Sequence, residues 1–220
     1  MKTSQSKTKL ASKIIFLFGL FLLSFQVVGL YQDPLSEALE PENSESLILG
    51  YHFTEDGIKE IEKILDDPNP DKLPLSKEWL VSTNNKVFKG LFHSQKAVKL
   101  RPNHNWLLWI ASMVSKDQLM YTQKTDIILK AGGAFCSQAA RVLQDVVSQA
   151  KLNSRFISFN GHVVLEVNTT DGWLVADPDY GVTYPFPVEE LVKKSNEKVV
   201  DSLLSSRGFG ENTIREYVNI

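Results

Sequence analysis

Apolar positions recur at helical spacing between residues 54 and 151, interrupted by stretches without a clear period. Side chains three and four residues apart share one face of a helix, so this spacing predicts amphipathic helices. The predicted helices are a segment capped by Thr54 with Ile58, Ile61, Ile64 and Leu65 on one face, then residues 106–115, about 117–130 and about 135–151. Residues 76–101 mix helical and strand character, and their pattern predicts no single element.

Beyond Asn153 the period changes to two. Alternation over residues 154–160, 162–168 and 173–177 predicts three consecutive antiparallel strands joined by short turns. Residues 182–184 suit a fourth strand, and Pro187 suits the first turn of a short helix over residues 188–194. Helices followed by strands are typical of an α+β fold, in which helices pack on an antiparallel sheet.

The first 30 residues form a region of their own. Four lysines precede an apolar run over residues 14–30, a pattern typical of an export signal. The run is long for a cleaved signal peptide and short for a membrane span, so both a signal peptide and a transmembrane signal anchor stay open. Either places the chain after Leu30 outside the cytoplasm, in a periplasmic or extracellular location. Residues 31–50 are polar and predict a spacer, and residues 51–220 form the folded domain.

Composition narrows the functional classes. The chain has 220 residues, 43% hydrophobic and 23% charged, with a net charge of −2. No basic run favours nucleic-acid binding. A single cysteine excludes an intrachain disulfide and any zinc site built from several thiolates. The four histidines, His52, His93, His104 and His162, are never three or four residues apart, and no metal or other cofactor is indicated.

The single cysteine, Cys136, occupies a position suited to chemistry. Gly132 and Gly133 end one predicted helix, because glycine tolerates the left-handed conformation of a helix C-terminus. Cys136 then falls in the first turn of the next helix. Backbone N–H groups are unpaired there, and the helix dipole favours negative charge. A thiolate is the nucleophilic form of cysteine, so this position favours attack on a carbonyl.

A histidine and an aspartate follow on neighbouring predicted strands. If His162 pairs with Asp177, then Asn168 pairs with Asp171 and the turn consists of Thr169 and Thr170. Residues opposite each other on antiparallel strands have Cβ atoms about 4.5–5.5 Å apart, so the carboxylate can orient the imidazole. The candidate catalytic residues are therefore Cys136 as nucleophile, His162 as general base and acid, and Asp177 as the orienting group.

Each of these residues also has a structural interpretation. A lone cysteine on an apolar helix face is commonly a buried small hydrophobe. A lone histidine at a strand start is commonly structural, and Asp-Pro is a common turn. The combination favours a catalytic triad, since the glycine stop, the helix-start cysteine and the opposed His/Asp pair occur in one stretch of the chain.

The segment from Gly133 to Pro178 resembles the transglutaminase-like superfamily. The matching residues are Gly133-Ala134-Phe135-Cys136, Arg155, Gly161-His162 and Gly172-Trp173-Leu174-Val175-Ala176-Asp177-Pro178. This resemblance implies a papain-like α+β fold with its core at residues 130–185, a helical lobe carrying the catalytic cysteine at a helix N-terminus and packed on an antiparallel sheet. Val163 stands where the family commonly has an aromatic residue.

The resemblance implies an enzyme that forms a thioester with an amide of a peptide or protein. We expect hydrolysis, as in a protease or amidase, rather than transamidation, because the short chain lacks modules that would present a second substrate. The alternatives are a non-catalytic binding module that keeps the fold and, more weakly, a thiol-redox protein, for which no resolving cysteine exists. The N–H groups at the start of the helix that carries Cys136 can form part of an oxyanion hole. For the upstream residue that completes the hole the sequence offers only the candidates Trp106, Trp109, Tyr121 and Gln123.

Overall fold

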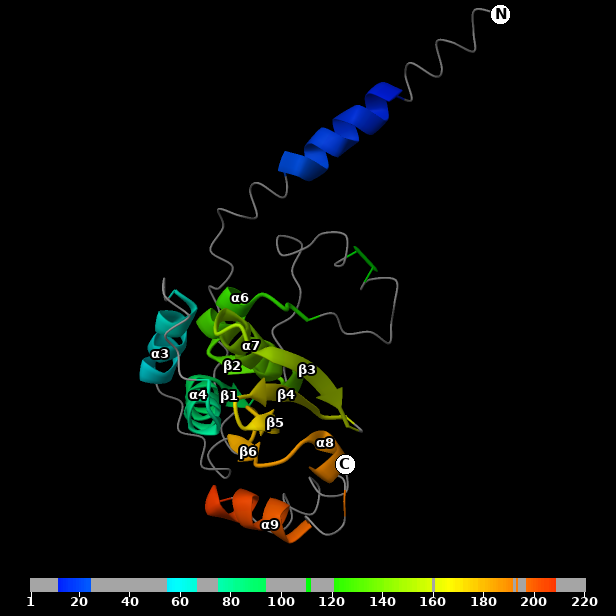
Figure 1. Ribbon diagram of the computed structural model, residues 1–220. Helices are drawn as coiled ribbons and strands as arrows, with labels where there is room; N and C mark the ends of the chain where they lie inside the picture. Colours follow the sequence, from blue (N-terminus) through cyan, green and yellow to red (C-terminus); the bar gives the residue numbers. More distant parts are fainter. Residues whose placement is uncertain are drawn as a thin grey trace, which may run out of the picture. The chain divides into compact units, whose positions relative to one another are not determined.

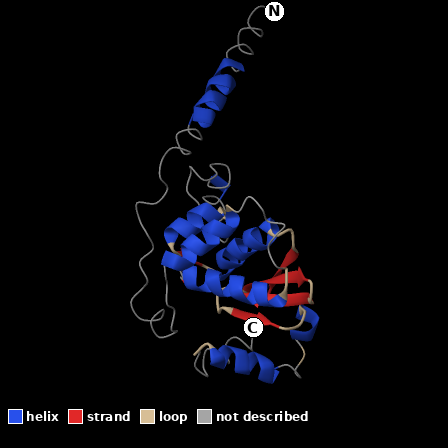
Figure 2. Cartoon of the chain, turned by 60° about the vertical axis from the view of Figure 1, so that its left-hand side comes forward, coloured by secondary structure: helices blue, strands red, loops and turns tan. Residues whose placement is uncertain are grey.

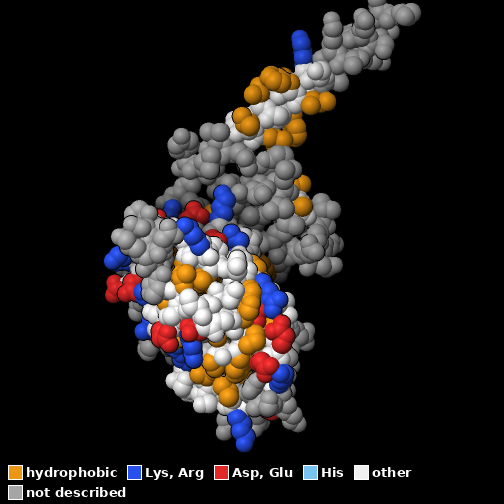
Figure 3. Space-filling view, viewed as in Figure 1, with side chains coloured by type: hydrophobic (Ala, Val, Ile, Leu, Met, Phe, Trp, Pro, Cys, Tyr) orange, Lys and Arg blue, Asp and Glu red, His pale blue; other side chains and the backbone are white. Residues whose placement is uncertain are grey.

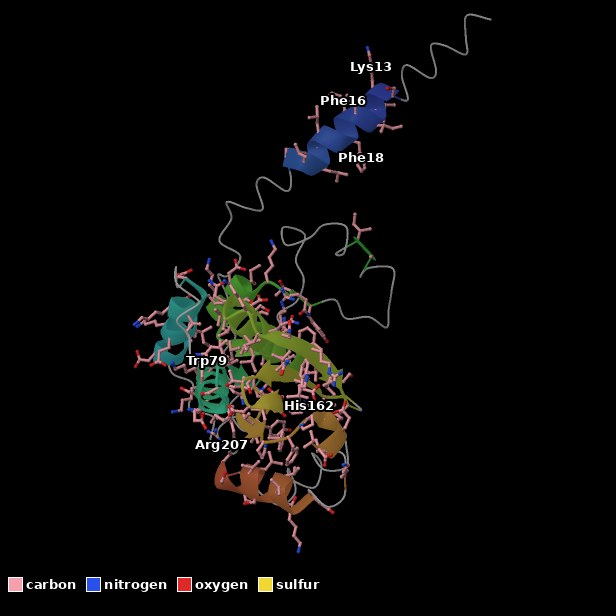
Figure 4. All side chains as sticks on the ribbon, viewed as in Figure 1. Lys13, Phe16, Phe18, Trp79, His162 and Arg207 are labelled. Carbon is pink, nitrogen blue, oxygen red and sulfur yellow. The ribbon has the colours of Figure 1, made fainter. Side chains whose placement is uncertain are left out.

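A computed structural model describes residues 12–24, 55–66, 75–93, 110–111, 121–159, 161–191, 193 and 197–208. The chain forms two compact units, residues 1–36 with 99–122 and residues 37–98 with 123–220. Within the first unit, residues 12–24 form a helix whose hydrophobic side chains are mostly exposed, as Figure 3 shows for the face in view and Figure 4 shows for Phe16 and Phe18. In the described part of the chain no helix is both long and apolar enough to span a membrane.

The second unit is α+β, as predicted, with helices around a four-stranded antiparallel sheet (Figures 1 and 2). Its labelled elements are α3 (Glu55–Leu65), α4 (Lys77–Gly90), β1 (Phe92–His93), α6 (Thr125–Ala131), β2 (Gly133–Ala134), α7 (Cys136–Gln149), β3 (Asn153–Ser158), β4 (Val163–Thr169), β5 (Gly172–Asp177), β6 (Val182–Tyr184), α8 (Val188–Leu191) and α9 (Glu197–Ser206).

Most predicted elements within the described residues are present. Helices α3 and α7, the four strands and the start of α8 match the expected ranges within a few residues. The helix expected from about residue 117 is wrong at its start, because residues 121–124 are not helical and α6 begins at Thr125. The helix expected over residues 106–115 and the cap at Thr54 lie almost wholly outside the described residues. So do the boundaries expected near residues 30 and 50.

The structure assigns two elements to the stretch that the pattern left open. Helix α4 begins at Ser76, whose side-chain oxygen accepts a hydrogen bond from the Trp79 backbone N–H. Strand β1 follows it directly and pairs in parallel with β2, with Phe92 opposite Gly133 and His93 opposite Ala134. This two-residue pairing joins segments 41 positions apart, and strands so short leave no period in the sequence.

The large sheet has the order β3-β4-β5-β6 with every neighbour antiparallel. Its β4–β5 register corrects the predicted hairpin by two residues: Thr169 pairs with Gly172 and Asn168 with Trp173. The loop is therefore Thr170-Asp171. Thr169 fixes it, because its hydroxyl oxygen accepts from the Asp171 N–H and its hydroxyl donates to the Gly172 carbonyl. A shift of two residues keeps every side chain on its expected face.

Two hydrophobic clusters cover the two faces of this sheet. Alternate residues Leu165, Val167, Leu174 and Ala176 pack with α3, α4, α6 and α7. The intervening Val164 and Val175 pack with β6 residues and with Val200 and Leu204 of α9. Strands β4 and β5 are thus covered on both sides, whereas the edge strand β3 is largely exposed. Arg207, labelled in Figure 4, donates a hydrogen bond to Asn85 and links the end of α9 to α4.

Helices α3 and α4 approach closely at a pair of glycines. A Cβ atom placed on Gly57 would lie 2.7 Å from the backbone nitrogen of Gly90 and 2.9 Å from its Cα. Backbone atoms cannot move aside cheaply, so we expect Gly57→Ala to destabilise the fold. Overpacking costs about 1–3 kcal/mol, and the gain of about 1 kcal/mol in helix propensity offsets only part of it. Urea unfolding of this variant, beside Glu62→Ala on the exposed side of α3, tests the contact. A Gly57→Ala protein as stable as the wild type would contradict it.

Candidate active site

Cys136 is the first residue of α7, as predicted. Gly132 ends α6 in the left-handed conformation, with φ of 69°, and its N–H donates to the Leu129 carbonyl. The chain then runs extended through β2 and Phe135 into α7. The buried Gln138 fixes the backbone at the start of α7, because its side-chain oxygen accepts a hydrogen bond from the Phe135 N–H at 3.4 Å. The thiol is free and only 3% exposed.

His162 lies in the segment immediately before β4 and Asp177 ends β5, and their side chains meet (Figure 4 labels His162). The distance from His162 Nε2 to Asp177 Oδ2 is 2.7 Å. With the corrected register Asp177 stands two residues away from the position directly opposite His162, so the contact is diagonal across the hairpin. Such diagonal neighbours remain within reach of long or aromatic side chains. The predicted pairing residues therefore do meet, although the predicted register was wrong.

Both oxygens of Asp177 are held in place. Oδ2 faces His162, while Oδ1 accepts from the backbone N–H groups of Asp179 at 3.0 Å and Tyr180 at 3.2 Å. The buried Asn84 of α4 donates to the Asp177 carbonyl at 3.3 Å and so ties the end of β5 to this helix. A side chain with no solvent exposure and fixed donors on one oxygen has a single orientation. Asp177 therefore presents its second oxygen to the imidazole in one geometry.

His162 is held as a cation at neutral pH. Burial lowers the pKa of this imidazole, but the charge of Asp177 and the hydrogen bonds to Asp177 and Cys136 outweigh burial and raise the pKa to about 11. In this form both ring N–H groups donate, Nε2–H to Asp177 and the other toward the sulfur of Cys136. Tyr180 packs edge-on against the ring at 5.4 Å between centroids. The three predicted residues thus form one hydrogen-bonded chain from sulfur to carboxylate.

A second His–Asp pair lies beside this chain and was missed by the sequence reasoning. Nδ1 of His93 on β1 lies 2.8 Å from Oδ1 of Asp179, whose side chain is 3% exposed. His93 is also close enough to His162 for their charges to interact. The sequence carries one signal for this pair, since Asp179 follows Asp177 by two residues.

The other residues singled out from the sequence do not join this site in the described structure. Trp106 and Trp109 lie outside the described residues, Tyr121 belongs to the first unit, and Gln123 is exposed. Arg155, one of the residues of the family resemblance, forms an ion pair with the buried Glu166 at 2.5 Å. The second carboxylate oxygen of Glu166 accepts from the Val188 N–H, so this ion pair positions α8.

Comparisons with protein-family models, curated sequences and solved structures return no match for this chain. Within the described ranges, no three His, Cys, Asp or Glu side chains are placed to hold a metal ion together. What the site can do follows from its own chemistry: a free thiol at a helix start, an imidazolium beside it and a fixed carboxylate behind.

Proposed function

We propose that this chain is a cysteine enzyme with a papain-like, transglutaminase-like core that cleaves amide bonds of peptides or proteins through a thioester. The observation that carries the proposal is the continuous hydrogen-bonded chain Cys136–His162–Asp177. A thiolate paired with an imidazolium, itself oriented by a carboxylate, is the arrangement that makes a cysteine nucleophilic. The helices-then-antiparallel-sheet architecture, with the cysteine at the start of α7, supports the same family resemblance.

The first half of the reaction acylates the enzyme. The Cys136 thiolate attacks the amide carbon and forms a C–S bond, while the carbonyl π electrons move to oxygen. When this tetrahedral intermediate collapses, the C–N bond breaks and the leaving amine takes the proton from His162. Backbone N–H groups at the start of α7 would donate hydrogen bonds to the oxyanion. The product is a thioester on Cys136 and a neutral imidazole on His162.

The second half releases the acyl group. Neutral His162 removes a proton from water, which attacks the thioester carbon; the C–S bond then breaks and the thiolate and imidazolium return. An amine in place of water would give transamidation. Hydrolysis is the favoured outcome, because the described unit offers no module for a second substrate. The proposed substrate is a peptide or polypeptide. The proposed location is extracytoplasmic, with residues 1–30 serving either as a membrane anchor or as an export signal.

One observation favours a second candidate, a non-catalytic binding module. Cys136 is only 3% exposed, as expected of a core cysteine. The two functions differ in the reactivity of the sulfur. At acidic pH a core cysteine without a partner base is a protonated thiol and hardly reacts, whereas a thiolate stabilised by an imidazolium remains reactive there.

Iodoacetamide alkylation at about pH 6 distinguishes these candidates. His162 keeps its proton until the pH rises toward its folded pKa of about 11, so its charge is fully present at pH 6. We expect Cys136 to react about 10–100 times faster than a free cysteine thiol, of which under about 1% is thiolate at this pH. Intact-protein mass spectrometry gives the rate. Reaction no faster than that of N-acetylcysteine at the same pH would favour the binding module.

A further inference from the structure

A second ion pair, His93–Asp179, completes a ring of linked residues that includes Cys136. On one side of the ring, His162 joins Cys136 to Asp177. The Asp179 N–H then donates to Asp177 Oδ1, and the Asp179 side chain in turn binds His93 Nδ1 at 2.8 Å. The ring is completed through the backbone, because β1 pairs with β2 two residues before Cys136. His93 is therefore tied to the site both through Asp179 and through the strand pairing beside the segment that carries Cys136.

The strand pairing fixes the direction in which His93 extends. His93 lies opposite Ala134, and opposite residues of neighbouring strands project to the same side of the sheet. Phe135 has extended backbone angles, φ −82° and ψ 158°, so the side chain of Cys136 returns to the side of Ala134. Adjacent strands are about 4.8 Å apart, which brings the His93 ring to the neighbourhood of the sulfur.

His93 is also more open to solvent than the other members of the ring. Its side chain is 29% exposed, against 7% for His162, 3% for Asp179 and none for Asp177. A substrate carbonyl that reaches Cys136 from solvent would therefore meet His93 at the rim of the site. Asp179 binds Nδ1, so a proton that His93 donates to a substrate is the one on Nε2, which the ring carries in its imidazolium form.

From this geometry we propose that His93, oriented by Asp179, donates a hydrogen bond to the acyl oxygen of the substrate and stabilises the oxyanion formed when Cys136 attacks. Resting on the proposed function, this inference supplies the oxyanion donor for which the sequence offered only candidates elsewhere. His93 keeps its proton throughout the reaction, and His162 carries out the proton transfers. Asp179 acts as a positioning residue through His93.

The electrostatics of the pair agree with a donor role. Burial lowers the pKa of His93, and the nearby positive charge of His162 also lowers it, but the hydrogen bond to Asp179 and the charges of Asp179 and Asp177 raise the pKa above its ordinary value. A cationic N–H donor placed where negative charge develops is worth more than a neutral one. The pair would thus be preorganised before the substrate arrives.

Two reactions of the same sulfur separate this role from a structural one. Alkylation by iodoacetamide is a direct displacement and develops no oxyanion. Acylation by p-nitrophenyl acetate does: the thiolate forms the C–S bond, the carbonyl oxygen becomes an oxyanion, and the C–O bond then breaks to expel p-nitrophenolate without needing a proton. Both rates are measured on the full chain, wild type beside His93→Ala, His93→Gln and Asp179→Asn, with thermal unfolding of each variant as a check on folding.

We expect His93→Ala to slow acylation about 100–1,000-fold, the usual cost of losing one oxyanion donor, while alkylation changes less than about threefold. His93→Gln retains an N–H donor and should recover part of the acylation rate. The acylation rate of Asp179→Asn should lie between those of the wild type and His93→Ala. Equal losses in both reactions, or no loss of acylation in folded His93→Ala and His93→Gln proteins, would overturn the inference. If wild-type Cys136 undergoes neither reaction faster than N-acetylcysteine at about pH 6, the proposed function fails and this inference fails with it.

Discussion

Replacing Cys136 with alanine should abolish thioester formation and reduce peptide hydrolysis by about a million-fold, the scale seen when the nucleophile of a catalytic triad is removed. The chain has no other cysteine to take over the attack. Hydrolysis is measured by mass spectrometry on a mixed peptide library with wild type and Cys136→Ala in parallel, and the acyl-enzyme is sought as a mass increase of the intact protein.

The variant should remain folded, so the loss can be assigned to chemistry. Cys136 is buried among small neighbours, and alanine already occupies the core positions Ala134, Ala139 and Ala140 around it. Removing one sulfur atom leaves a small cavity that costs on the order of 1 kcal/mol. Ser148→Ala, an exposed change near the end of α7, is the matched control and should keep full activity. Residual hydrolysis by Cys136→Ala within tenfold of the wild type would remove Cys136 from the mechanism.

The predictions from sequence succeeded where local chemistry determines structure. Gly132 ends a helix because only glycine readily adopts its φ of 69°, and the spacing of Ala140, Leu143 and Val147 requires a buried helix face after it. These signals placed Cys136 at the start of α7 without tertiary information. The α+β class followed in the same way from the change of period after Asn153.

The register of the β4–β5 hairpin was beyond the sequence pattern, because a two-residue shift leaves the alternation of faces unchanged. The deciding contacts come from elsewhere in the chain. Asp171 Oδ2 accepts from the Lys77 N–H at 2.7 Å, and the Thr170 N–H donates to the Leu75 carbonyl at 3.0 Å. The hairpin loop is thus fastened to the start of α4, a helix that the pattern did not predict.

His93 escaped prediction for a related reason. Its strand contains two residues, and its partner Asp179 is 86 positions away. Neither a two-residue strand nor so distant a partner produces a recognisable pattern in the sequence. The parallel pairing of β1 with β2 places this histidine opposite Ala134, two residues before Cys136, so the second ion pair is a property of the tertiary fold.

Asp177→Asn should lower peptide hydrolysis by about 1,000–10,000-fold although it changes only one atom of the side chain. The reason is the fixed pair of donors at Oδ1. The N–H groups of Asp179 and Tyr180 require an acceptor there, so the amide oxygen of asparagine must occupy this end. Its NH₂ group then faces His162 Nε2, which must accept. The ring is left neutral with its proton on Nδ1, facing the sulfur, and cannot remove a proton from the thiol.

The same variant should lose the fast alkylation at about pH 6. Burial lowers the pKa of His162, and the charge and hydrogen bond of Asp177 are what raise it. Iodoacetamide labelling, peptide hydrolysis and urea unfolding are measured together. Asp171→Asn is the matched control: it makes the same change at an exposed carboxylate on the far end of the hairpin and should leave both rates unchanged. If Asp177→Asn instead keeps at least a tenth of the wild-type rate, asparagine has rotated to accept from His162, and the two backbone donors do not dictate the tautomer.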